Sequence, residues 1–339
     1  MRAALLTATG GPEVLQVRAD VPVPQPTEGE VLIEVGACGL NNTDLNTRRG
    51  WYGESGWDGA LALPLIQGAD VCGRVAALGT GADPGLLGRR VLVDPWIRRS
   101  SGSDWRDHTA YLGSELDGGF AEYCVVPSGN AHPIDSALTD AELATFPCSW
   151  SAAENMLARA DLSPGERIAI PGASGGVGSA LVQLAKVRGA HVTAITGPGK
   201  SEAVGALGAD AVLTRETPDV PGAAAGLSGP FDVVADIVGG RDVPGWWGAL
   251  RRGGRYVCAG AIAGHIVDLD LRTLYLNDLT LIGATACPPE VFRTLIALIE
   301  SSAVRPVLAA TYPLEQIHEA QEAFETKKHV GSIVISMTE

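Results

Sequence analysis

The sequence predicts an α/β protein in which a doubly wound parallel sheet is joined to a second, β-rich domain. Three observations support this fold class. The chain has 339 residues, which is long enough for two domains. Short β-type segments broken by Gly and Pro fill the chain to about Asn130. After His132, apolar strand-like segments alternate with helical ones, which is typical of a parallel sheet covered on both faces.

The first part of the chain is predicted to be a compact β-rich domain. Its strands are expected at Glu30–Gly36, Gly73–Leu78, Arg90–Val93 and Ala121–Val126. The segment Trp96–Leu116 is polar and irregular, and we expect a surface loop or lobe there.

The second part is predicted to alternate between helices and strands. Helices are expected at Leu138–Leu143 and Ser151–Ala160, and the first two strands at Ile168–Pro171 and His191–Thr196. Further apolar runs follow as DAVLT, FDVVADIV, GRYVCAGA and LTLIGATA. Two helices and a strand are expected to complete the chain, at Pro289–Ser301, Leu314–Thr326 and Gly331–Ser336.

Charge and cysteine content limit the partners and the compartment. The formal charge is 25 − 39 = −14, and such a chain repels nucleic acids and anionic membranes, so neither is expected as a partner. The cysteines are scattered without a CxxC pair, which favours reduced thiols. The N-terminus lacks the features of a signal peptide, and no apolar run is long enough to span a bilayer. We therefore expect a cytoplasmic protein.

The most specific motif is the glycine loop Gly172–Gly178, GASGGVG, between a predicted strand and an amphipathic helix. Glycines there allow a tight turn, a close approach to a pyrophosphate and close helix–strand packing, and the helix N-terminus attracts the phosphate. Ala173 stands in place of the first motif glycine. We expect a nicotinamide dinucleotide on a Rossmann domain, bound by Ala173, Ser174, Gly175, Gly176, Val177 and Gly178. A glycine-rich turn without a ligand is the alternative.

The end of the second strand bears on the choice of nucleotide. A carboxylate at this place would bind the ribose of NAD, but the chain has Thr196-Gly197-Pro198-Gly199-Lys200. The absence of an acid, with Lys200 nearby, favours NADP(H), and Thr196 and Gly197 are expected to contact it. NAD(H) stays open, with Lys200 simply solvated. Other cofactor contacts are expected at Ile237, Gly260 and Ala261.

Four runs together resemble the medium-chain dehydrogenase/reductase superfamily: GASGGVG, DIVGG at Asp236–Gly240, LDGGFAEY at Leu116–Tyr123 and HVGSIVI at His329–Ile335. The resemblance covers essentially the whole chain. It implies a GroES-like catalytic domain over residues 1–130 and 287–339 and a Rossmann domain over residues 131–286. It also implies a homodimer paired through the strand Leu279–Ala284, because an apolar edge strand needs covering.

The zinc ligands of alcohol dehydrogenases in this superfamily have poor counterparts here. Asn41 matches the first Cys, Ala69-Asp70 matches the His-Glu pair, and only Cys148 matches a ligand, the last Cys. Catalytic zinc needs three protein ligands, so we expect no zinc. The cysteines of the structural zinc lobe are missing from Trp96–Leu116 as well. A makeshift site from Asp70, Cys148 and a third group is the alternative, and Cys148 could also be a small buried residue.

The same region resembles the zinc-free quinone oxidoreductases and enoyl-thioester reductases of the superfamily. Their N-x-x-D-x-x-x-R-x-G-x-Y pattern is present as Asn41, Asp44, Arg48, Gly50 and Tyr52. The resemblance implies catalytic roles for Asn41, Asp44 and Tyr52, with Tyr52 assisting protonation. Trp51, Asp70 and Cys148 are expected to line the substrate pocket. In the alternative, Asp44 neutralises Arg48 and Tyr52 is a wall residue.

These observations predict an NAD(P)H-dependent oxidoreductase acting on a small molecule. Without zinc, a conjugated enone or a quinone is an easier acceptor than a plain ketone, because its negative charge spreads into an enolate or hydroquinone oxygen. The hypothesis is hydride transfer from NADPH to such an acceptor. The alternatives are a metal-free alcohol/ketone dehydrogenase and a non-catalytic NADPH-binding scaffold or sensor. Fold alone does not determine the substrate.

Overall fold

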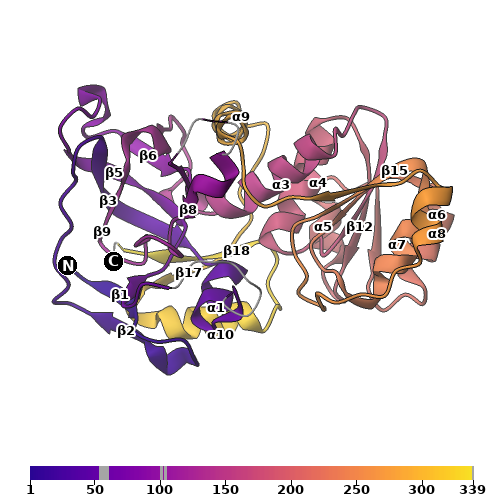
Figure 1. Ribbon diagram of the computed structural model, residues 1–339, viewed down its shortest axis with the longest axis horizontal. Coiled ribbons are helices and arrows are strands. Elements are labelled where there is room, and N and C mark those ends of the chain that lie inside the picture. Colours follow the sequence, from indigo (N-terminus) through magenta and orange to yellow (C-terminus); the bar gives the residue numbers. More distant parts are fainter. Residues whose placement is uncertain (53–60, 100–101, 103–104, 338–339) are drawn as a thin grey trace. The chain divides into compact units, whose positions relative to one another are not determined.

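The computed structural model describes residues 1–52, 61–99, 102 and 105–337. The chain divides into two compact units (Figure 1): unit 1 comprises Met1–Cys148 with Pro306–Glu339, and unit 2 comprises Ser149–Arg305. Both divisions fall later in the chain than residues 130 and 286, where the sequence led us to expect them. Among the described residues, no helix is both long and apolar enough to cross a bilayer.

Local packing explains where the units divide. Helix α2 (Asp140–Leu143) packs on the sheet of unit 1, and Arg90 holds the chain before it by donating to the carbonyl oxygen of Leu138 at 2.9 Å. In unit 2, the Cys287 thiol contacts the carbonyl oxygen of Ser151 at 3.6 Å. The segment after residue 286 is therefore held by unit 2.

Unit 1 is built on a seven-stranded sheet that is centred on β3 (Glu30–Gly39). Antiparallel neighbours of β3 are β5 (Asp70–Leu78), β9 (Tyr123–Pro127) and β18 (Ser332–Ser336). The sheet is completed by β6 (Arg90–Val93), β10 (Ala131–Pro133) and β17 (Leu308–Pro313). A three-stranded sheet has the order β2 (Leu15–Arg18), β1 (Ala3–Leu6) and β4 (Leu65–Ile66). Their apolar side chains form one buried cluster.

Helix α1 (Asn42–Arg48) lies beside α10 (Ile317–Glu325) in unit 1 (Figure 1). The guanidinium groups of Arg48 and Arg49 contact Glu325 Oε1 at 3.1 and 2.8 Å. Arg48 is buried, so this contact partly offsets the cost of taking its charge out of water. The ion pairs fix the C-terminal end of α1 against the rest of the unit.

The segment Trp96–Leu116 differs from the expected surface loop. Its ends form β7 (Trp96–Arg98) and β8 (Thr109–Tyr111), which pair antiparallel. Trp96 and Ile97 of the first of these strands are buried, although most of the segment is polar. The prediction of a polar loop was therefore wrong for these two strands.

Unit 2 contains a six-stranded parallel sheet with the order β13-β12-β11-β14-β15-β16. The strands are β11 (Arg167–Pro171), β12 (His191–Thr196), β13 (Ala211–Thr214), β14 (Phe231–Asp236), β15 (Leu250–Cys258) and β16 (Thr280–Gly283). The predicted α/β class, a parallel Rossmann sheet with a β-rich domain, is confirmed. The strand order reverses between β11 and β14, and that is where such sheets bind ligands.

Helices cover this sheet. Helix α4 (Gly176–Val187) packs on β11 and β12, and α5 (Ser201–Gly205) packs on β12 and β13. Figure 1 shows α6 (Val220–Ser228), α7 (Val243–Ala249) and α8 (Leu271–Leu276) side by side. The unit also includes α9 (Pro289–Glu300) and most of α3 (Pro147–Arg159).

Strand β16 is an edge of the parallel sheet, where Leu281 is 42% exposed. The neighbouring α8 also exposes Leu271, Tyr275 and Leu276. An apolar edge of this kind is a surface on which chains associate. The homodimer through Leu279–Ala284 stays a prediction.

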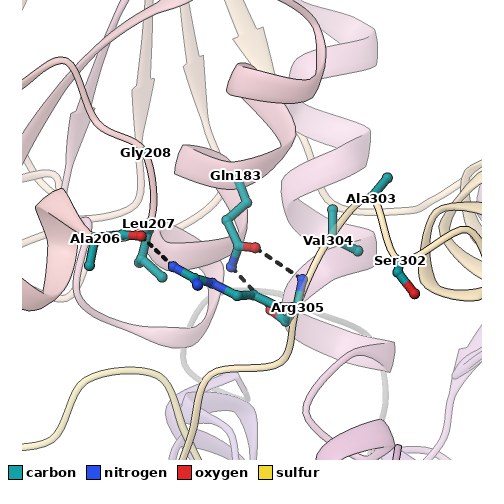
Figure 2. Close-up of a pocket in the computed structure, with 8 residues that line it drawn as sticks. All are labelled: Gln183, Ala206, Leu207, Gly208, Ser302, Ala303, Val304 and Arg305. Atoms are coloured by element: carbon teal, nitrogen blue, oxygen red, sulfur yellow. Dashed lines mark hydrogen bonds between the residues drawn. The ribbon is translucent and has the colours of Figure 1, made fainter. Parts of the chain in front are cut away.

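A shallow polar hollow on unit 2 lies where the chain leaves that unit (Figure 2). Gln183 of α4 donates to the carbonyl oxygen of Arg305 and accepts from its backbone N–H, both at 3.1 Å. The Arg305 guanidinium donates to the carbonyl oxygen of Ala206. These bonds fix the last residues of unit 2 onto α4, and no residue of the glycine loop lines the hollow.

Candidate functional site

The glycine loop of unit 2 connects β11 to α4. Gly172 has a φ of +78°, a conformation that favours glycine, and starts the turn out of the strand. The backbone N–H of Ala173 donates to the carbonyl oxygen of Ile195 at 2.9 Å, which ties the loop to β12. Gly175 is the N-cap of α4 and has no side chain to cap the helix. The first-turn N–H groups of α4 have no partner within the helix, as at any helix N-terminus.

The loop glycines differ in the space around them. A Cβ added at Gly178 would lie 2.2 Å from the carbonyl oxygen of Gly172, so only glycine allows this approach of helix to strand. At Gly175 the nearest atom to an added Cβ is the same oxygen at 3.9 Å, and the φ of −79° suits any residue. Gly178 is thus needed for the close packing of α4 on β11. Gly175 instead leaves open space beside its backbone, which we call the cradle.

The ends of neighbouring strands meet beside this loop. A Cβ added at Gly172 would lie 3.2 Å from Cγ1 of Ile237, which follows β14. A Cβ added at Gly260, which follows β15, would lie 2.8 Å from the carbonyl oxygen of Ile237. The structure therefore brings the predicted residues Gly172, Ile237 and Gly260, with adjoining Ala261, to one edge of the sheet. This edge includes the point where the strand order reverses.

The turn after β12 contains Lys200 and lies beside a second positively charged residue, Arg215. Thr196 is buried, and within the described part of the chain its Oγ1 has no hydrogen-bond partner. Burial, followed by the charge of Arg215, lowers the pKa of Lys200. The guanidinium carbon of Arg215 lies 4.0 Å from a Cβ placed on Gly197. Thr196, Gly197 and Lys200 are thus accompanied by a second cation that the sequence analysis missed.

Sheet register explains the position of Arg215. Strands β12 and β13 pair in parallel with Thr196 opposite Thr214, and the backbone N–H of Arg215 donates to the carbonyl oxygen of Thr196 at 2.8 Å. Arg215 is the first residue after a predicted apolar strand. Its place next to the turn follows once the strand order is known, which the sequence alone does not give.

In unit 1, Asn41 is the N-cap of α1 and holds Asp44 close to it. The backbone N–H of Asn41 donates to Asp44 Oδ2 at 2.7 Å, as in a capping box. Gln67 Nε2 donates to the carbonyl oxygen of Asp44 at 2.8 Å. Asn41 and Asp44 therefore lie together and are fixed through backbone groups.

Asp70 joins this group from the first position of β5. Its Oδ2 accepts from Nδ2 of Asn41 at 2.8 Å, and its Oδ1 accepts from the backbone N–H of Cys148. A Cβ added at Gly39 would lie 2.8 Å from Asp70 Oδ2, so this glycine leaves room for the carboxylate. The structure thus brings together Asn41, Asp44, Asp70 and Cys148.

Both carboxyl groups of this cluster are buried and hold their protons more tightly than usual. Burial raises the pKa of Asp44 to about 7, against hydrogen bonds from the backbone of Asn41 and Gly68. Burial likewise raises the pKa of Asp70 to about 7, and the charge of Asp44 adds to the effect. The cluster therefore changes its charge close to neutral pH.

Tyr52 lies close enough to Cys148 and Asp44 for their charges to act on it. Burial and these charges raise the pKa of Tyr52, so its hydroxyl keeps its proton at neutral pH. Its oxygen lies 3.5 Å from Nδ2 of Asn46. Trp51 contacts the Tyr52 ring edge-on at 5.1 Å and is 39% exposed.

One further polar group of this region was missed. Thr43 Oγ1, in the first turn of α1, is buried and makes no hydrogen bond with any described residue. A buried hydroxyl without a partner is uncommon in proteins. Thr43 is not part of the Asn41–Tyr52 pattern, and the burial of its hydroxyl appears only in the folded structure.

The residues at the zinc-ligand positions do not fit a catalytic zinc. Ala69 has no donor atom, and the Asn41 amide already directs its Nδ2 to Asp70. Within the described ranges, no three His, Cys, Asp or Glu side chains are grouped as a metal site requires. These residues therefore do not supply the three protein ligands that a catalytic zinc needs.

A β-rich unit joined to a doubly wound unit with a glycine loop defines the class of two-domain dehydrogenases and reductases. Residues 27–136 match the family model of the alcohol dehydrogenase GroES-like domain. Residues 176–301 match that of the zinc-binding dehydrogenases. The chain is 30% identical to an NAD-dependent alcohol dehydrogenase of Sulfolobus acidocaldarius over 100% of both chains.

Two other relatives agree with this class. A quinone oxidoreductase of Rattus norvegicus is 28% identical, with 95% of this chain and 93% of the relative covered. The crystal structure of a putative alcohol dehydrogenase from Sinorhizobium meliloti is 46% identical, with a TM-score of 0.95 over 99% of this chain and 96% of that one. The chain belongs to the medium-chain dehydrogenase/reductase superfamily and is an oxidoreductase, which favours an enzyme over the scaffold alternative.

The raised pKa values give a stability profile with a defined sign. Folded Asp70 binds its proton more tightly than unfolded Asp70. Its contribution to the free energy of unfolding is therefore complete below about pH 4 and is lost as pH rises through about 7. Asp70→Asn, which stays neutral, should make the fall in unfolding free energy between these pH values shallower. Urea unfolding at several pH values measures this slope.

A variant at a residue whose pKa is shifted in the opposite direction provides the control. Hydrogen bonds and the charge of Arg2 lower the pKa of Glu122 in the same unit. Glu122→Gln should therefore lower the free energy of unfolding by a constant amount at neutral pH, and this difference should shrink only as pH falls through about 4. An Asp70→Asn profile parallel to that of the unmodified protein would contradict the assignment of a raised pKa to Asp70.

Proposed function

We propose that this oxidoreductase uses NADPH to reduce an activated alkene (an enone) or a quinone, without zinc. The observation that carries the proposal is the cluster of unit 1, in which an amide, two buried carboxyl groups and a tyrosine lie around the positions that match the zinc ligands of alcohol dehydrogenases. A plain ketone would need strong stabilisation of a localised alkoxide. An enone or quinone needs only hydrogen bonds to a delocalised oxyanion.

The chain's own groups have distinct tasks in this proposal. When bound, the nicotinamide supplies the hydride. Asn41 donates a hydrogen bond to the acceptor's carbonyl oxygen, and Tyr52, protonated at neutral pH, donates a second hydrogen bond or the proton. Asp44 supports Asn41 through its backbone N–H. Trp51 and Cys148 provide walls of the acceptor pocket.

The proposal predicts which acceptors turn over and that no metal is needed. With NADPH, enones or quinones should be reduced at the same rate before and after dialysis against EDTA, as followed by nicotinamide absorbance. Asn41→Ala should lower kcat by about 100-fold, the usual loss of an oxyanion donor. Oxidation of simple alcohols that EDTA abolishes, with every enone and quinone inert, would contradict it.

A second candidate is an alcohol/ketone dehydrogenase. The names of the relatives from Sulfolobus and Sinorhizobium favour it. The same panel distinguishes the two, because this candidate turns over alcohols or plain ketones in the presence of EDTA.

The proposal of NADP(H) rather than NAD(H) is supported by Lys200 and Arg215. Two cations at the turn after β12 would attract a 2′-phosphate, and no carboxylate is present in Thr196–Lys200 to repel it. The name of the NAD-dependent relative favours NAD(H) instead. Kinetic measurements with both nucleotides distinguish the two.

Arg215→Ala tests the nucleotide. Loss of a charge-assisted hydrogen bond should raise KM for NADPH by about 10- to 100-fold and leave KM for NADH unchanged. Arg293→Ala, which removes another exposed cation of unit 2, is the matched control and should change neither value. Equal effects of Arg215→Ala on both nucleotides would argue against the proposal.

The glycine loop allows a second test of cofactor binding. Gly175→Ala should fold normally, because the added Cβ meets open space, yet it should weaken NADPH binding by at least about tenfold. Gly178→Ala should instead lose about 1–3 kcal/mol of stability, because its Cβ collides with backbone. Thermal unfolding without cofactor and fluorescence titration separate the two effects. Unchanged NADPH affinity in folded Gly175→Ala would rule out this cradle.

A further inference from the structure

The carboxylate of Asp70 is buried under unusual conditions. Only 1% of the residue is exposed, and among the described residues its oxygens accept from two neutral donors, the Asn41 amide and the Cys148 backbone. A buried carboxylate without a cation costs free energy. Gly39 leaves the room that Asp70 needs, since a Cβ there would also lie 2.5 Å from the carbonyl oxygen of Ala144. The surrounding residues thus accommodate a carboxylate whose burial lowers the stability of the fold.

The two hydrogen bonds connect distant parts of the sequence. Residues 41, 70 and 148 come from the start of α1, the start of β5 and the start of α3. Residues 41 and 148 match the first and last zinc-ligand positions of the zinc dehydrogenases, and residue 70 directly follows Ala69, which matches the remaining ligand position. In this chain a carboxylate links the first and the last of them.

The bond to Asn41 also determines how that amide lies. Its backbone N–H is engaged by Asp44 and a side-chain N–H by Asp70, so the residue is held at two points. A carboxylate can accept only from the NH2 end of an amide and not from its oxygen. Ionised Asp70 therefore fixes which end of the Asn41 amide faces it.

We propose that Asp70 is a positioning residue, which fixes the Asn41 amide for hydrogen bonding to the acceptor. This inference rests on the proposed function, and it differs from the expectation that Asp70 lines the substrate pocket. In this role Asp70 acts through Asn41 and does not touch the acceptor.

Asp70→Asn is a sharp test because the two side chains have the same shape. An amide has one accepting oxygen, so either Asn41 or the Cys148 N–H would face an NH2 group. We expect kcat to fall on the order of 100-fold, the loss typical of a misplaced catalytic group. The Kd for NADPH should stay unchanged, because the glycine loop is in unit 2. Asp70→Ser replaces Asp70→Asn if the latter does not fold.

A double-mutant cycle with Asn41→Ala decides whether Asp70 acts through Asn41. If it does, Asp70→Asn lowers kcat in the unmodified protein but causes no further loss in the Asn41→Ala background. An equal loss in both backgrounds, or an unchanged kcat, overturns the proposal. Asp94→Asn is the matched control: Asp94 is 2% exposed, and its oxygens accept from Trp96 N–H and Arg98. It should lower stability without lowering kcat.

A spectroscopic measurement tests the positioning role of Asp70 without relying on turnover of any acceptor. The chain has six asparagines, so selective 15N labelling gives few side-chain amide signals, and Asn41→Ala identifies the signal of Asn41. In protein without cofactor, Asp70→Asn should shift that signal, whereas Asp94→Asn should not. An unshifted signal overturns the positioning role even if enones are reduced. A shifted signal with no acceptor turned over refutes the proposed function alone.

Discussion

The site in unit 1 depends on one buried carboxylate. Asp70 must find hydrogen-bond donors inside the protein, because burial removes the water that would otherwise solvate it. The Asn41 amide and the Cys148 N–H meet this need, and Gly39 provides the space. The geometry of the amide, of the start of α1 and of residue 148 therefore follows from the solvation of a single group.

The two units contribute different groups to the oxidoreductase. Unit 2 offers a helix N-terminus, a loop whose Gly175 leaves room for a ligand, and two cations beyond β12. Unit 1 offers hydrogen-bond donors and groups that gain or lose protons near neutral pH. Where relatives have a metal ligand, Ala69 has no donor atom. In the proposed function, hydrogen bonds rather than a metal stabilise the developing negative charge, and this favours acceptors with delocalised charge.

Local patterns in the sequence were enough to predict the fold and the loop. The alternation of apolar strands with helices, and the glycines from Gly172 to Gly178, act over short distances that a sequence displays directly. Arg215 was missed because its place depends on which strand pairs with β12. The β7–β8 hairpin was missed because Trp96 and Ile97 are buried within a segment that is otherwise polar. The bond from Asp70 to Asn41 spans 29 residues, and only the folded sheet brings its ends together.

The position of Arg215 has a consequence for how such an enzyme changes during evolution. Arg215 is exposed and comes from a strand end separate from the glycine fingerprint. Exchange of an exposed residue at a strand end has little effect on packing. Under the proposed role of Arg215, substitutions at this one position can change the preferred nucleotide, NADP(H) or NAD(H), and leave both the glycine loop and the site in unit 1 intact.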